Sequence, residues 1–231
     1  MTLPLCELRD QQGVRLVNSK FPPISLFEDV ATADEFDALN ALQALTNPRL
    51  LNEMGVLNVL PVAERPFGIV GAGYAVAPFT HVNPQGSRFS NGDFGVLYIA
   101  DTLETAIAEV RYHQQRYWQG VQGLHYDRLV FRALVCRYDA LPCADASALP
   151  LDDAIYHPTD YHAAQQLGAQ LRQMGMVGLR YRSVRQFNAL CVALFTPRQL
   201  HSLLQSCHLE TIWDGQQICG VHQLSSQQPA I

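Results

Sequence analysis

The stretch that decides the fold runs from Gly86 to Trp118 and reads GSRFSNGDFGVLYIADTLETAIAEVRYHQQRYW. Asn91-Gly92 is a typical tight-turn pair. The aromatic and β-branched run that follows, from Phe94 to Ala100, predicts a strand, so that a hairpin or bent ribbon forms here. Asp101 is placed to cap a helix, with Glu104 as its capping-box partner. The stretch therefore predicts a strand, a turn, a second strand and a capped helix.

The predicted helix has one apolar side at helical spacing, formed by Leu103, Ala106, Ile107, Val110 and Gln114. At roughly 100° per residue, Glu109 and His113 lie at the edge of this side, where a carboxylate is partly removed from water. Arg88, Tyr98 and Glu109 thus follow one another on successive elements. These residues alone also fit a simpler reading, in which Arg88 and Glu109 form a surface ion pair and Tyr98 is a core aromatic.

The pattern resembles the core of the RES domain, the toxin half of many bacterial toxin–antitoxin pairs, named for an arginine, a glutamate and a serine. The matching motifs are Arg88-Phe89, Leu97-Tyr98, Ala106-Ile107-Ala108-Glu109 and, downstream, Tyr181-Arg182-Ser183-Val184-Arg185. The resemblance extends over about residues 35–200. It implies an α+β fold, with a small mixed or antiparallel sheet split around a nicotinamide pocket and flanked by helices, similar to ADP-ribosyltransferase toxins.

The resemblance further implies a toxin that uses NAD as its substrate and cleaves the nicotinamide–ribose bond, as a glycohydrolase or a phosphorylase. Breaking this bond builds positive charge on the ribose, which a fixed carboxylate stabilises, and Glu109 is expected in that role. Arg88 is expected to hold phosphate or ribose oxygens through its planar fork of donors. Ser183 is expected to hydrogen-bond the ribose or carboxamide. The remaining predicted ligand contacts are Tyr98, Phe89, His113 and Arg185.

Two alternative functions stay open at this point. Compact RES proteins carry a further arginine ahead of the Arg-Phe motif, but no arginine occurs between Pro66 and Ser87, and the motif does not identify Arg65 as its counterpart. The chain could instead be an ADP-ribosyltransferase that modifies a protein target through the same pocket. It could also be a RES-like binding module without activity.

The resemblance implies a protein partner, a cognate Xre-type antitoxin whose helix-turn-helix part carries the DNA contact, with a possible homodimer of this chain within the complex. The composition agrees with that division of roles. The net charge of −5 and the lack of a basic run argue against direct nucleic-acid binding. With 48% apolar and 16% charged residues in 231, the chain predicts one globular unit rather than a disordered protein.

The cysteine and histidine spacings exclude two further classes of site. The six cysteines include no CxxC pair, which favours reduced thiols over a disulfide framework. The eight histidines show no HExxH spacing, and no metal is predicted. The segment Met1–Arg9 does not resemble a signal peptide and no run approaches 18 apolar residues, so a cytoplasmic protein without membrane association is expected.

Along the chain, residues 1–60 are predicted to form an N-terminal arm and helical lead-in, and residues 61–231 the RES domain. Helices are expected over residues 32–45, in a shorter segment ending near 55, and over 161–174. Strands are expected over residues 13–17, 129–136, 177–181 and 189–195, with strand-like pieces in 201–221. Residues 61–85 are predicted to form a strand followed by a loop, and residues 138–153 a loop.

Overall fold

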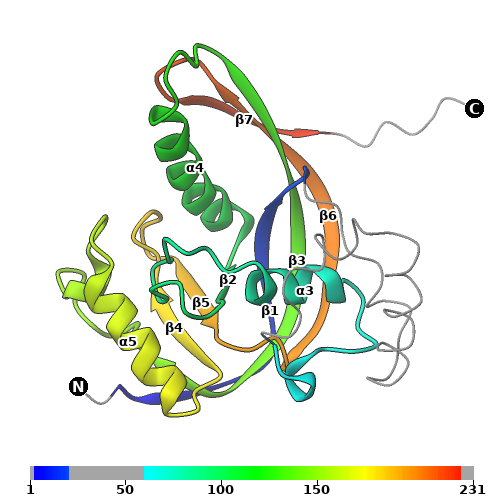
Figure 1. The fold of residues 1–231 in the computed structure, drawn as a ribbon, viewed down its shortest axis with the longest axis vertical. Helices are drawn as coiled ribbons and strands as arrows, with labels where there is room; N and C mark the ends of the chain where they lie inside the picture. Colours follow the sequence, from blue (N-terminus) through cyan, green and yellow to red (C-terminus); the bar gives the residue numbers. More distant parts are fainter. Residues whose placement is uncertain (1–2, 21–59, 225–231) are drawn as a thin grey trace, which may run out of the picture.

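The computed structural model describes residues 3–20 and 60–224, so the two helices predicted before residue 60 lie outside the described residues. Its helices are α3 (Ala72–Thr80), α4 (Leu103–Gln119) and α5 (His162–Gln173), with 3-10 turns η3 (Val62–Glu64) and η4 (Ala154–Tyr156). Its strands are β1 (Leu5–Asn18), β2 (Leu97–Ala100), β3 (Asp127–Asp145), β4 (Gly178–Arg182), β5 (Leu190–Leu194), β6 (Leu200–Trp213) and β7 (Ile218–Leu224). The fold is α+β, as predicted (Figure 1). None of the helices in these ranges is both long and apolar enough to cross a bilayer.

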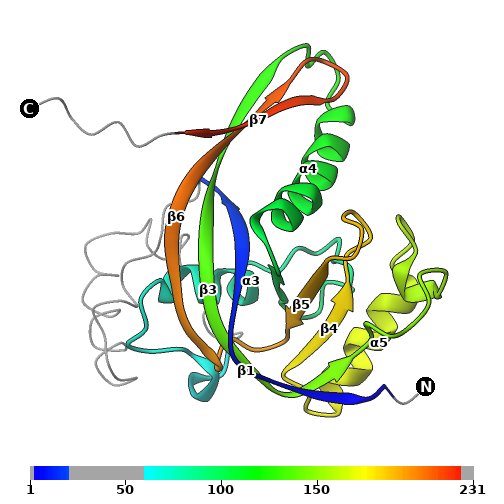
Figure 2. The ribbon, with the colours of Figure 1, turned by 180° about the vertical axis from the view of Figure 1, so that it is seen from behind.

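The strands form one mixed sheet in the order β1-β2-β5-β4-β3-β6-β7, in which β1 also pairs with β3. Five strands therefore close into a ring, and the β6–β7 hairpin extends from it. Among the strand pairs of the described residues, only β3 and β4 run parallel. The ring is weakest between β1 and β2, which share the single register pair Val14 and Ala100. The long curved strands β1, β3 and β6 lie side by side, and α4 stands opposite them (Figure 2).

Strand β3 continues to Asp145, so the loop predicted over residues 138–153 was wrong for 138–145 and right for 146–153. Pro142 lies where β3 changes neighbours, from β6 at Tyr138 to β4 at Cys143. The side chain of Gln199 replaces a strand partner there. Its Oε1 accepts from Leu141 N–H and its Nε2 donates to the Leu141 carbonyl, both at 2.8 Å. A proline is tolerated because this position needs no ladder hydrogen bond.

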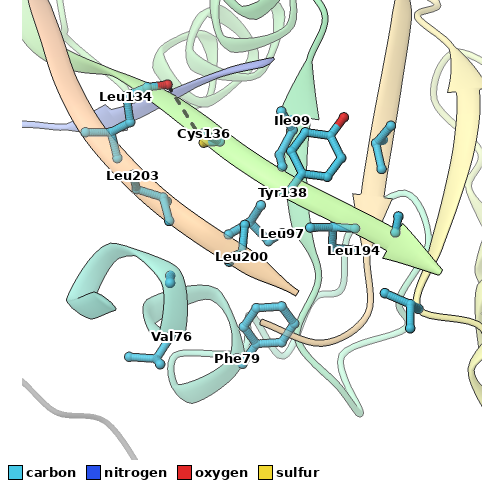
Figure 3. Packing of buried hydrophobic residues seen from close by; sticks show 14 of the residues in the cluster. Val76, Phe79, Leu97, Ile99, Leu134, Cys136, Tyr138, Leu194, Leu200 and Leu203 are labelled. Atoms are coloured by element: carbon cyan, nitrogen blue, oxygen red, sulfur yellow. Dashed lines mark hydrogen bonds between the residues drawn. The ribbon is translucent and has the colours of Figure 1, made fainter. Parts of the chain in front are cut away.

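The strand predicted within residues 61–85 is instead helix α3. Its small and apolar residues recur three to four apart and pack on the sheet in one buried cluster, in which Val76 and Phe79 lie with Leu97 and Leu203 (Figure 3). Gly71 precedes the helix with a positive φ of 79°, and a β-carbon there would lie 2.2 Å from the Leu203 carbonyl oxygen. Gly71 thus permits close helix–sheet contact.

The local predictions around α4, α5 and the strands β4 to β7 are confirmed, with one correction at the start of α4. The N-cap is Thr102, whose Oγ1 accepts from Thr105 N–H at 3.2 Å. Asp101 instead accepts a hydrogen bond from Leu190 N–H at 2.7 Å and ties the helix start to β5. The other end of α4 is fixed by Trp118, which packs on Trp213 of β6 with ring centroids 5.6 Å apart. Both ends of the helix that carries Glu109 are therefore held to the sheet.

Candidate active site

A cavity of about 510 Å³ opens at the weak point of the ring, between β1, β2 and α4. This volume is within the range of small-molecule sites. Its polar lining comes from elements far apart in the sequence: Arg15, Ser87, Arg88, Tyr98, Glu109, His113 and Tyr161. Three of the residues predicted from the sequence to contact ligand or to act in catalysis, namely Phe89, Ser183 and Arg185, do not line it.

Arg88 lies on a tight turn rather than on the first strand of a hairpin. Ser87 and Ser90 form an isolated bridge, with Ser87 N–H donating to the Ser90 carbonyl at 2.7 Å. The turn is anchored by Tyr98, whose hydroxyl accepts from Phe89 N–H at 3.0 Å and is hydrogen-bonded to Ser87 Oγ at 2.8 Å. A strand was the wrong prediction here because these side-chain bonds replace a ladder.

Arg88 as a residue is only 9% exposed, and hydrogen bonds hold its guanidinium in one orientation. Its Nη1 donates to the carbonyls of Ile155 and His157, each at 3.1 Å. The ring of Tyr161 covers it, with Cζ 4.5 Å from the ring centroid. Within residues 3–20 and 60–224 its other two nitrogens have no hydrogen-bond partner, so a fixed fork of donors is available to an anion.

Glu109 and Ser183 meet although they are 74 residues apart, because the β4–β5 connection reaches the inner side of α4. Ser183 Oγ donates to Glu109 Oε1 at 2.6 Å and accepts from the N–H groups of Arg185 and Gln186, both at 3.1 Å. Ser183 is buried and lies behind the carboxylate. The serine therefore holds Glu109 in position, and its own hydrogen-bonding capacity is used within the protein.

Tyr98 lies in the lining of the cavity, whereas Phe89 lies outside it. Burial, only partly offset by the hydrogen bond from Ser87, raises the pKa of Tyr98 to about 12, so the phenol is neutral at pH 7. Its ring borders the cavity, while its hydroxyl serves the Arg88 turn. Phe89 has no exposed surface and packs edge-on against Tyr181, with ring centroids 4.8 Å apart. Phe89 is thus a core residue beneath the turn.

His113 and Arg185 lie toward the mouth of the site. His113 borders the cavity with an exposed side chain. The pKa of His113 is lowered to about 4, first because protein atoms on its inner side desolvate the imidazole. The positive charges of Arg185, Arg88 and Arg116 lower it further, so the imidazole is neutral at pH 7. The Arg185 guanidinium lies over Tyr112, with Cζ 3.3 Å from the ring centroid, and donates to the Pro158 carbonyl.

Arg15 of β1 is a pocket residue that the sequence prediction missed. Its Nη1 donates to the Tyr98 carbonyl at 3.2 Å, across the split between β1 and β2. Its Nε is buried and has no partner among the described residues. Burial lowers the pKa of Arg15, but an arginine stays charged at neutral pH. The clue was an arginine inside the apolar run Val14–Val17. Arg65, the candidate considered before, donates to the Leu60 carbonyl at 3.2 Å and does not line the cavity.

The site combines two arginines and one carboxylate with neutral polar rings. In the part of the chain that the structure describes, no three His, Cys, Asp or Glu side chains gather in a way that could hold a metal ion. All six cysteines are free thiols. The charges present suit a ligand with an anionic part, bound by the arginines, and a second part that becomes positive and lies near Glu109.

Comparison with known proteins gives three matches. The RES domain family model matches residues 65–214, a segment that contains Arg88, Glu109 and Ser183. The chain is 27% identical over 208 residues to uncharacterized protein y4oC of Sinorhizobium fredii (strain NBRC 101917 / NGR234). The aligned region covers 88% of this chain and 84% of that protein. It is also similar to a chain in the crystal structure of the M. tuberculosis MbcT–MbcA toxin–antitoxin complex. That similarity has 10% identity and a TM-score of 0.45, and it covers 87% of this chain and 86% of the other.

Proposed function

This chain belongs to the RES domain family, and on that basis we propose that it is the toxin of a toxin–antitoxin pair and degrades NAD by cleaving its nicotinamide–ribose bond. The observation that carries the proposal is the Glu109 carboxylate, fixed by Ser183 at 2.6 Å in the wall of a cavity that also contains Arg15 and Arg88. A fixed carboxylate and an anion-binding pair are the two features that this reaction needs.

The arginines bind the diphosphate of NAD in this proposal. Two nitrogens of the Arg88 guanidinium and the buried Nε of Arg15 have no hydrogen-bond partner among the described residues, so both arginines present donors that phosphate oxygens satisfy. Because each guanidinium is already anchored by a hydrogen bond to a backbone carbonyl, little side-chain entropy is lost on binding. The diphosphate therefore orients the nicotinamide ribose toward α4.

Glu109 acts on the ribose. When the bond between the ribose carbon and the nicotinamide nitrogen breaks, its electron pair leaves with nicotinamide and the ribose becomes oxocarbenium-like. The negative charge of Glu109 stabilises this transition state, and Ser183 keeps the carboxylate in place. A water molecule that then attacks the ribose carbon gives ADP-ribose and releases one proton. Phosphate as the acceptor gives ADP-ribose phosphate instead.

The partner in this proposal is a cognate Xre-type antitoxin, as the RES resemblance implies, and it carries any DNA contact. The enzyme acts in the cytoplasm, where NAD is available and free cysteines are stable. An antitoxin that covers the pocket mouth near His113 and Arg185 would block access of NAD. The intact complex is then expected to be inactive.

An assay of the purified chain with NAD, with and without phosphate, tests the proposal. Release of nicotinamide with ADP-ribose indicates a glycohydrolase, and ADP-ribose phosphate formed only with phosphate present indicates a phosphorylase. Labelled ADP-ribose that ends on protein would replace the proposal with an ADP-ribosyltransferase. Persistence of NAD under every condition, with folded protein that still binds NAD, would favour an inactive binding module.

A further inference from the structure

We propose that Tyr161 is a substrate-binding residue of this pocket, whose hydroxyl donates a hydrogen bond to a phosphate oxygen of the bound nucleotide. The inference deepens the proposed function, because it assigns a third donor to the anion-binding part of the same site. Tyr161 precedes α5 and lines the cavity beside Arg88. It lies outside every motif that the sequence singled out.

The hydroxyl of Tyr161 is the feature that needs an explanation. The oxygen is buried, yet no described residue hydrogen-bonds to it. Neighbouring tyrosines differ in this respect, since the hydroxyl of Tyr156 donates to the Ala146 carbonyl at 2.7 Å and that of Tyr98 accepts from Phe89 N–H at 3.0 Å. A buried hydroxyl without a partner costs stability, so a phenylalanine would serve the apolar surroundings better.

The ring of Tyr161 has a structural role that does not require the hydroxyl. The centroid of the ring lies 4.5 Å from Arg88 Cζ, so the ring packs on one face of the guanidinium. A phenyl ring makes the same contact. The ring therefore explains an aromatic residue at this position but not a tyrosine. A ligand that brings an acceptor oxygen to the hydroxyl supplies the missing partner.

The charges nearby indicate what kind of acceptor this is. Three residues that line the cavity carry donors without partners among the described residues: the Tyr161 hydroxyl, Arg15 Nε, and Nε and Nη2 of Arg88. Two of these residues are positively charged, so the ligand group that approaches them is anionic and rich in oxygen. A diphosphate meets this requirement, and a neutral ribose or the nicotinamide ring meets it less well.

The test compares two tyrosine-to-phenylalanine variants that remove the same atom. Tyr161→Phe keeps the ring over Arg88, and we expect it to bind ADP and ADP-ribose about 10- to 100-fold more weakly than wild type, as for one lost hydrogen bond to a charged group. Its melting temperature should be unchanged or higher, because a buried unpartnered hydroxyl is removed. Tyr156→Phe, which loses a satisfied hydroxyl away from the cavity, should melt at a lower temperature and bind both nucleotides normally.

Calorimetric titrations with ADP and ADP-ribose, thermal melts and an NAD turnover assay on the same preparations separate the outcomes. Equal affinity of wild type and Tyr161→Phe for ADP overturns the inference. Weaker binding of ADP-ribose with unchanged binding of ADP also overturns it, because the hydroxyl would then contact the ribose. A wild-type protein that binds ADP through Tyr161 but never consumes NAD refutes the proposed function and leaves the inference standing.

Discussion

Replacing Glu109 with glutamine tests the proposed mechanism most directly, because the change removes a negative charge and almost nothing else. Glu109 Oε1 accepts the hydrogen bond from Ser183 at 2.6 Å, and the amide oxygen of glutamine accepts the same bond. Within residues 3–20 and 60–224, Glu109 forms no ion pair that the substitution would break. The free energy of unfolding should therefore change by less than about 1 kcal/mol.

Turnover should respond far more strongly than stability. Loss of one fixed electrostatic stabiliser costs about 2.7–4 kcal/mol in the transition state, which corresponds to a fall in kcat of roughly 10²- to 10³-fold. Affinity for NAD should stay within about threefold, since the charge acts mainly once the ribose becomes positive. The assay is NAD consumption at saturating substrate, with a thermal melt and an NAD titration on the same variant. A folded glutamine variant with near wild-type turnover would refute the role of Glu109.

Three other variants test the neighbours of Glu109. Ser183→Ala leaves two part-buried N–H groups and the carboxylate without this partner, so it should destabilise the protein by about 1–3 kcal/mol in a denaturant melt and lower kcat about tenfold. An unchanged kcat would show that Glu109 needs no positioning by Ser183. Arg15→Met should weaken NAD binding about tenfold in a titration, because one of two cations is lost, and unchanged affinity would remove Arg15 from the site. His113 is neutral in the folded protein above its pKa of about 4 but protonates near pH 6.5 when unfolded, so it costs stability as the pH falls from about 6.5 to 4. His113→Gln should therefore flatten the fall of melting temperature over that range, and an unchanged slope would show that the folded-state pKa is not lowered.

The parts of the fold that the sequence predicts well are those determined by local patterns. Helix α5, strands β4 and β5, and the serine connection between them follow from periodicity, glycine stops and short apolar runs. The failures have equally physical causes. Helix α3 forms where a strand was predicted, and Gly71 at its N-cap allows close contact with β6. Strand β3 passes through Pro142 because a side-chain amide replaces a ladder partner there. In both places a distant tertiary contact decides the local structure.

The active site shows the same division between local and distant information. The family motifs identify Arg88, Glu109 and Ser183. No local sequence pattern predicts that Ser183 lies behind the Glu109 carboxylate and does not line the cavity. Arg15 is harder still to predict from local sequence, because it reaches the pocket only when β1 pairs with β3. That pairing runs from Leu5 opposite Ala144 to Asn18 opposite Phe131, and it brings the Arg15 guanidinium to the Tyr98 carbonyl. Closing a loop of that length is costly in chain entropy and is offset only by the completed sheet. The anion-binding half of the pocket therefore forms together with the ring of strands, while α4 and the β4–β5 connection supply the carboxylate half. A variant that loosens β1 should accordingly lose nucleotide affinity before it disturbs the hydrogen bond between Ser183 and Glu109.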